Sequence, residues 1–195
     1  LALGLAIGSI PVLAATIPSD PLFERQWQLS KIQAPEAWDT LRGSGDVVVA
    51  IIDTGVDANH EDLQGSIYVN PNEIPGDGRD NDGNGFIDDV SGWDFYDHDN
   101  DPSPLIDVGL PEGSRHGTIV AGIIGAQSDN AIGMAGLNWN VQIMPLRVLN
   151  SDGDGFLSSI LRAIDYAIEQ DVDVINMSFV GEFGGYSAEV LGTTA

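Results

Sequence analysis

The sequence contains no cysteine and very few basic residues. Without cysteine the chain forms no disulfide bonds and carries out no thiolate chemistry. Seven Lys and Arg residues stand against 30 Asp and Glu residues, which gives a formal net charge of −23. Proteins that bind nucleic acid use clusters of Lys and Arg to contact phosphates, so this balance argues against nucleic acid as a partner. The acidic excess instead suits cation binding or solubility in a salty medium.

The apolar run at the start of the chain is too short to span a bilayer comfortably. Residues 1–15, LALGLAIGSIPVLAA, are uncharged and almost wholly apolar, and Pro18 and Pro21 follow closely. An apolar stretch of this length that ends in small residues is typical of a secretion signal. We therefore expect a signal remnant at 1–15, a secreted protein and no stable membrane insertion; the alternative is a short membrane anchor. The remaining residues, 16–195, are enough for one domain with a sizeable core.

Buried strands alternate with helical patterns along the rest of the chain. Continuous Val, Ile and Leu runs predict core strands at 46–52, 141–149 and 172–178. Helices are predicted near 35–41, at 116–127 and at 156–170; the last has a helical apolar stripe made of Leu157, Ile160, Leu161, Ile164 and Ile168. This alternation predicts an α/β fold with a parallel, doubly wound sheet flanked by helices.

Two polar residues occupy positions where such sheets place their active sites. Asp53 ends the first predicted strand, and His116 begins a predicted helix. Active sites of parallel sheets lie beyond the carboxyl ends of the strands, and a buried charge is costly unless something holds it. An Asp oriented against a His makes the imidazole a competent general base for activating a hydroxyl. The alternatives are that Asp53 only caps a turn and that His116 is structural.

Four segments in order resemble the successive sequence blocks of the subtilases, the subtilisin-like serine proteases. They are VVVAIIDTGVDANHEDL (47–63), RHGTIVAGIIGA (115–126), NAIGMAGLNWNVQIMPLRVL (130–149) and VDVINMSFVG (172–181). Residues 20–39 resemble the start of the mature enzyme in the thermitase-like branch. The resemblance implies that 16–195 is the amino-terminal portion of a subtilisin-like catalytic domain, incomplete in this chain, that hydrolyses proteins or peptides.

By the same resemblance, Asp53 is the acid of an Asp-His-Ser triad and His116 is its general base. The segment Ser178-Phe179-Val180 corresponds to the edge that pairs with an extended substrate, and an added strand gains main-chain hydrogen bonds there. Val180 stands where the family usually has Gly, and Ile119 replaces a common His.

The family's nucleophilic Ser and oxyanion Asn lie further along the chain than this sequence reaches. Only 79 residues follow His116, so we expect the 195 residues alone to be inactive. Two other functions stay open. One is a non-catalytic, calcium-binding relic of a subtilase. The other is an aspartic protease, which also carries Asp-Thr-Gly but needs two such carboxylates, whereas one copy occurs here.

An acidic, Gly- and Asn-rich insert at about 70–101 has the features of a calcium loop. In DNDGNGFIDD (80–89), Asp80, Asp82 and Asn84 alternate and a glycine follows at position six, as in the first half of an EF-hand loop. The carbonyl of Phe86 and the carboxylates of Asp88 or Asp89 are candidates to close the site. The alternative is a solvated acidic loop, although the aromatic residues Trp93, Phe95 and Tyr96 predict that the segment is packed down.

The resemblance alone implies a second calcium site that joins the amino-terminal arm to the core. Its side-chain ligands correspond to Asp20, Asp62 and Asn130, and its carbonyl ligands to Ser128, Ile132 and Met134. The segment 150–156 is also acidic and Gly-rich, but the family has a metal-free loop there.

Overall fold

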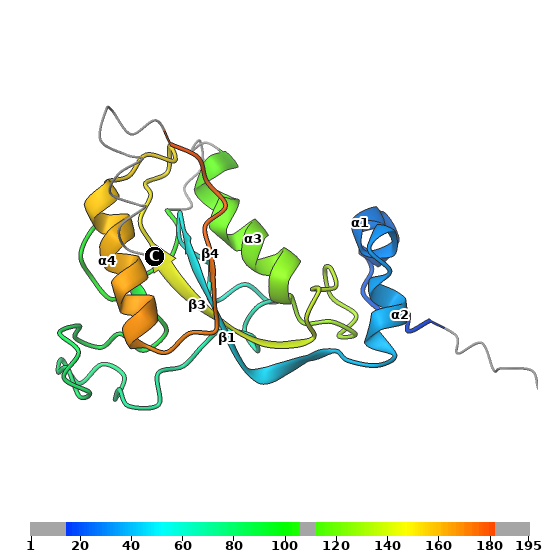
Figure 1. Ribbon diagram of the computed structural model, residues 1–195, viewed down its shortest axis with the longest axis horizontal. Helices are drawn as coiled ribbons and strands as arrows, with labels where there is room; N and C mark the ends of the chain where they lie inside the picture. The colour runs from blue at the N-terminus through cyan, green and yellow to red at the C-terminus, as the bar shows by residue number, and fades with distance from the viewer. Residues whose placement is uncertain (1–14, 106–111, 182–195) are drawn as a thin grey trace, which may run out of the picture.

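A four-stranded parallel sheet organises the chain (Figure 1). The computed structural model describes residues 15–105 and 112–181. The sheet order is β2-β3-β1-β4, and every neighbouring pair is parallel. The strands span Gly43–Asp53 (β1), Trp93–Asp94 (β2), Asn140–Arg147 (β3) and Val174–Asn176 (β4). The prediction of an α/β fold with a parallel sheet is confirmed, and the leader, 1–14, lies outside the described residues.

The two longer helices pack on opposite faces of this sheet (Figure 1). Alternate residues of β1 explain the layering, because successive side chains of a strand point to opposite faces. Ala50 and Ile52 pack in the cluster that contains residues of α4 (Leu157–Glu169), whereas Val49 and Ile51 pack in the cluster that contains residues of α3 (His116–Gly125). Within the described residues no helix is long and apolar enough to cross a membrane.

The buried face of α4 differs from the predicted apolar stripe. Ile160 is buried, but Ile168 is 64% exposed. The buried set also includes small residues and one aromatic residue: Ser159, Ala163, Tyr166 and Ala167. Small side chains let the helix approach the sheet closely, and Tyr166 fills the remaining space against Phe86 and Phe95.

The amino-terminal arm is folded rather than extended. It contains η1 (Phe23–Arg25), α1 (Trp27–Lys31) and α2 (Ala34–Trp38). A third hydrophobic cluster of Leu29, Ala34, Trp38 and Ala135 holds the arm against the loop that precedes β3. The buried Gln26 side chain donates to the Ala135 carbonyl (2.7 Å) and accepts from its N–H (2.8 Å). The sequence predicted only the short helix near 35–41.

The acidic insert at about 70–101 is mostly irregular but packed against the core, as its aromatic residues predicted. Phe95 is fully buried in the core beneath α4. The ring of Phe86 contacts Trp93 (centroids 5.0 Å apart) and Tyr166 (4.9 Å). A short helical turn, η2 (Glu112–Arg115), leads directly into α3. The insert is therefore anchored to the α4 face of the sheet.

Candidate active site

The structure brings together Asp53 and His116. Nδ1 of His116 lies 2.9 Å from each carboxylate oxygen of Asp53. Asp53 is completely buried, whereas the His116 side chain is 44% exposed. The alternation of side chains along β1 explains why Asp53 and His116 come into contact. Val49 and Ile51 face α3, so Asp53, two residues further on, is delivered to the start of the same helix.

Thr54 and Gly55 fasten the end of β1 to the beginning of α3. The Thr54 hydroxyl donates to the Ser114 carbonyl (3.3 Å) and accepts from the Gly117 N–H (3.1 Å). The Thr54 N–H donates to Oδ1 of Asp53 (2.7 Å). Gly55 has φ +96° and the Pro102 carbonyl oxygen lies 2.6 Å from where its Cβ would be, so glycine is required there. The Asp-Thr-Gly motif thus fixes both the carboxylate and the helix that carries the imidazole.

The hydrogen-bond partners give His116 a different tautomer from the other two histidines. Carboxylates only accept hydrogen bonds, so Nδ1 of neutral His116 carries the proton and Nε2 is left with a lone pair. In His60, Nδ1 accepts from the Asp62 N–H (3.2 Å). In His98, Nδ1 faces a guanidinium nitrogen of Arg162 (3.5 Å), which can only donate. His116 alone has the tautomer suited to general-base work through Nε2.

The segment predicted to bind substrate lies beside two hollows near α4. Ser178 donates to the Asn176 side chain (2.9 Å), and Phe179 packs against the core, whereas Val180 is 98% exposed. Phe179 and Val180 line both hollows, of about 370 and 330 Å³. Asp154, in the turn after β3, also lines the first of these hollows. Their role in binding substrate remains a prediction.

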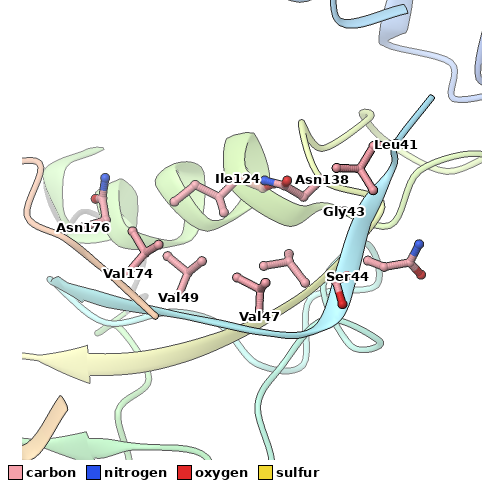
Figure 2. Close-up of a pocket in the computed structure, with 11 residues that line it drawn as sticks. Leu41, Gly43, Ser44, Val47, Val49, Ile124, Asn138, Val174 and Asn176 are labelled. Atoms are coloured by element: carbon pink, nitrogen blue, oxygen red, sulfur yellow. The ribbon is translucent and has the colours of Figure 1, made fainter. Parts of the chain in front are cut away.

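A further hollow lies away from the Asp53–His116 pair. It has a volume of about 440 Å³ and is lined by residues of the amino-terminal half of β1, together with Ile124 of α3 and Val174 of β4. Figure 2 shows Val47, Val49 and Val174 projecting into this space beside α3. Asp53 ends the opposite half of β1, so this apolar groove does not contribute to the candidate active site.

In the acidic insert, two of the predicted calcium ligands each accept three hydrogen bonds from backbone amides. Asp80 accepts from the N–H groups of Gly83, Asn84 and Gly85, which lower the pKa of its carboxyl group, Gly85 most strongly. Asp88 likewise accepts from the N–H groups of Gly76, Asp77 and Gly78. Both carboxylates therefore hold the turns of the insert in shape.

The other predicted acidic ligands converge with a residue that the sequence did not reveal. Among the described residues, one group of three acidic side chains has oxygens within 4.8 Å of one another: Glu73, Asp82 and Asp89. Asn84 donates to both Asp82 (3.2 Å) and Asp89 (2.8 Å). The Phe86 N–H donates to the Asn84 side-chain oxygen (2.8 Å). Glu73 falls outside the alternating motif, so only its charge in an acidic segment could have indicated it.

The predicted ligands between arm and core also lie in one region. Oδ2 of Asp20 accepts from the Asp129 N–H (2.7 Å), and Asp20 Oδ1 is buried without a hydrogen-bond partner. Asp62, also buried, accepts from the Asn130 side chain (2.9 Å) and the Met134 N–H (2.9 Å). Asn130 in turn accepts from the Ile132 N–H (2.7 Å), and the Ser128 hydroxyl donates to the Gly136 carbonyl (3.2 Å). Oxygen donors of this kind suit calcium.

A buried ion pair lies at the same edge of the sheet. Arg147 ends β3 next to Asp53 in register, and its guanidinium pairs with Asp94 of β2 and with Asp97 (2.8 Å). Burial raises the pKa of the Asp94 carboxyl group, and Arg147 acts in the opposite direction. Arg147 and Asp94 are both almost fully buried, so each depends on the other for charge compensation.

Comparison with known proteins places most of the chain in one family. The model of the Subtilase family matches residues 44–192. Thermitase of Thermoactinomyces vulgaris is 38% identical over 168 residues, which are 86% of this chain and 49% of thermitase. The halolysin-like extracellular serine protease Nep of Natrialba magadii is 33% identical over 83% of this chain and 26% of its own length. The chain therefore spans about half or less of the length of these relatives.

Solved structures agree with this assignment. A protease from Pseudoalteromonas arctica superposes with a TM-score of 0.61 at 32% identity, covering 84% of this chain and 51% of the other. A cold-adapted subtilisin-like serine proteinase gives a TM-score of 0.50 at 29% identity, covering 78% and 44% of the two chains.

Proposed function

The chain belongs to the subtilase family, and we propose that residues 16–195 form the amino-terminal portion of the catalytic domain of a serine endopeptidase. The contact between Asp53 and Nδ1 of His116 is the observation that carries this proposal. In the proposed reaction, Nε2 of His116 takes the proton of a serine hydroxyl supplied by the rest of the catalytic domain. Asp53 holds the required tautomer and stabilises the charged imidazole.

The partners of Asp53 favour this function over an aspartic protease. That chemistry needs two carboxylates that share a proton. Among the described residues, the side chain that contacts the Asp53 carboxylate is an imidazole. The buried carboxylate is therefore arranged to orient a base.

We propose that the substrates are proteins or peptides that lie along the segment 178–180. An extended substrate would add to this exposed edge through main-chain hydrogen bonds. The hollows lined by Phe179 and Val180 would receive its side chains. Peptide substrates are consistent with the names of the relatives, which are proteases.

We also propose that the protein is secreted and that it binds calcium. The apolar leader at 1–15 fits an exported protein, and one relative is described as extracellular. Calcium would bind in the acidic insert at 70–101 and between the arm and the core, where Asp20 and Asp62 are buried. The chemistry of these sites fits the ion, because all the donors are oxygens.

Nitrogen NMR on the imidazoles tests the proposal without requiring the nucleophile. The spectra are recorded at about pH 8.5, two units above the ordinary pKa of His. We expect His116 to be protonated on Nδ1 and both His60 and His98 on Nε2. Asp53→Asn should shift His116 toward the Nε2-protonated tautomer. An Nε2-protonated His116 in the unmodified protein would contradict the proposed role of Asp53.

A further inference from the structure

Three carboxylates of the acidic insert meet without a basic partner. Glu73, Asp82 and Asp89 each present an oxygen within 4.8 Å of the others. In the described part of the chain, the ion pairs involve Asp53, Asp94 and Asp97, so no basic side chain neutralises this group. Three negative charges at this separation repel one another. A cation between them would turn this repulsion into attraction.

Two oxygens of the group are buried and have no hydrogen-bond partner. They are Oε2 of Glu73 and Oδ1 of Asp89, whose residues are 7% and 0% exposed. The other oxygen of each carboxylate is firmly held. Oε1 of Glu73 accepts from the N–H groups of Asn81 (2.7 Å) and Asp82 (3.2 Å). Each carboxylate is thus anchored through one oxygen while the other is left unsatisfied, which is costly unless a ligand binds it.

A second layer of polar side chains orients two of the three carboxylates, those of Asp82 and Asp89. Oδ2 of Asp82 accepts from Asn70 (3.0 Å) and Asn84 (3.2 Å). Oδ2 of Asp89 accepts from Asn84 (2.8 Å) and from the hydroxyl of Tyr166 (2.6 Å). Metal-binding carboxylates are characteristically hydrogen-bonded in this way.

The donor set selects the type of cation. All three donors are carboxylate oxygens on irregular backbone, and hard divalent cations prefer such ligands. Calcium accepts flexible, variable coordination, whereas magnesium demands a near-ideal octahedron. Asp82 is exposed, which leaves room for water to complete the coordination. Calcium is therefore the cation that fits.

We propose that Glu73, Asp82 and Asp89 are the carboxylate ligands of a calcium ion that ties the insert to α4. This deepens the proposed calcium binding of the insert and rests on it. The ligand set differs from the EF-hand-like motif, because Asp80 and Asp88 hold backbone turns instead. Tyr166 belongs to α4 and donates to the ligand Asp89, so the ion and the helix are connected through a single side chain.

Calorimetric titration of the calcium-stripped full chain with calcium chloride tests the ligand set. Glu73→Gln should remove one equivalent of bound calcium or weaken one site by more than about 100-fold, beyond the 10–100-fold typical of second-layer substitutions. Glu169→Gln, the same substitution at an exposed position of α4, is the matched control and should leave the isotherm unchanged. Tyr166→Phe should weaken the same site by about 10–100-fold without changing the stoichiometry.

Two further variants make the outcome decisive. Asp82→Asn alters an exposed ligand and should lose the same equivalent even if Glu73→Gln fails to fold. Asp20→Asn, in the arm, should affect a different equivalent. A parental isotherm for Asp82→Asn, or loss of the site in Asp80→Asn with Glu73→Gln unaffected, would overturn the proposal. Calorimetry reports binding alone, so an absence of peptidase activity in the complete protein would refute the proposed function and leave this result standing.

Discussion

Replacing Gly117 with alanine tests how closely α3 must approach Asp53. Gly117 follows His116 in the first turn of α3. An added Cβ would lie 2.3 Å from the Gly55 carbonyl oxygen and 3.1 Å from Cβ of Asp53, whereas ordinary contacts begin near 3.4 Å. The start of the helix would therefore have to move by about 1 Å to relieve the contact.

The size of the effect follows from two opposing terms. Alanine gains about 0.5–1 kcal/mol over glycine in a helix, but overpacking costs about 1–3 kcal/mol. We expect a net loss of about 1–2 kcal/mol in the free energy of unfolding. A displacement of about 1 Å in a catalytic group can cost about 10²-fold in rate. The loss in kcat/KM of the complete protein should therefore be larger than the loss in stability suggests.

Gly122→Ala is a matched control in the same helix. Its added Cβ would meet only Sδ of Met134, at 3.4 Å, which is an ordinary contact with a flexible side chain. This substitution should raise stability by about 0.4–1 kcal/mol and leave kcat/KM unchanged.

Urea unfolding, peptide hydrolysis and imidazole NMR measure the three consequences separately. Gly117→Ala should lower stability and kcat/KM and disturb the Nδ1-protonated tautomer of His116. If Gly117→Ala behaved like Gly122→Ala in all three assays, the close approach of α3 to β1 would not position the base, and the reasoning would fail.

Three other experiments give independent checks. In the complete protein, Asp53→Asn should lower turnover by about 10⁴-fold, as in other serine protease triads, and steady-state kinetics with His116→Ala should show losses that do not add. Arg147→Met leaves the buried Asp94 uncompensated and should cost about 3–5 kcal/mol in urea unfolding, whereas Asp97→Asn, at a half-exposed partner, should cost under about 1 kcal/mol. Calcium at about 100-fold over Kd should add about 2.7 kcal/mol of stability; identical melting temperatures with and without chelator would contradict this.

The sequence predicted the candidate catalytic pair because local geometry sets both positions. The buried run of β1 ends on Asp53, and the period of two places that residue on the same face as Val49 and Ile51. His116 is the first residue of a helix that packs on this face. Parallel topology then brings strand end and helix start together. The contact could be expected without knowing any loop conformation.

Helical spacing predicted the existence of α4 but not its buried face. Five large apolar residues mark a stripe, yet Ile168 is mostly exposed and Tyr166 is buried. The sheet surface beneath the helix already carries large side chains, including Phe95 and Met144. Ala163 and Ala167 fit against them where larger residues would not. The face of α4 that is buried depends on how its side-chain volumes fit those of the sheet, and the sequence of one segment alone does not encode this fit.

The acidic insert shows why a ligand pattern along the chain is a weaker guide than a strand end. Asp80 and Asp88 match the calcium motif, but each lies close to glycine-rich turns whose free N–H groups need acceptors. Short acidic side chains readily satisfy such neighbouring amides, so these two carboxylates are used in closing the turns. Glu73 has no place in the motif, and it meets Asp89 only after the chain between them has folded back. In this Gly-rich acidic loop, the candidate ligands are therefore Glu73 and Asp89, which retain an unsatisfied buried oxygen after the local turns have formed, together with the exposed Asp82 beside them.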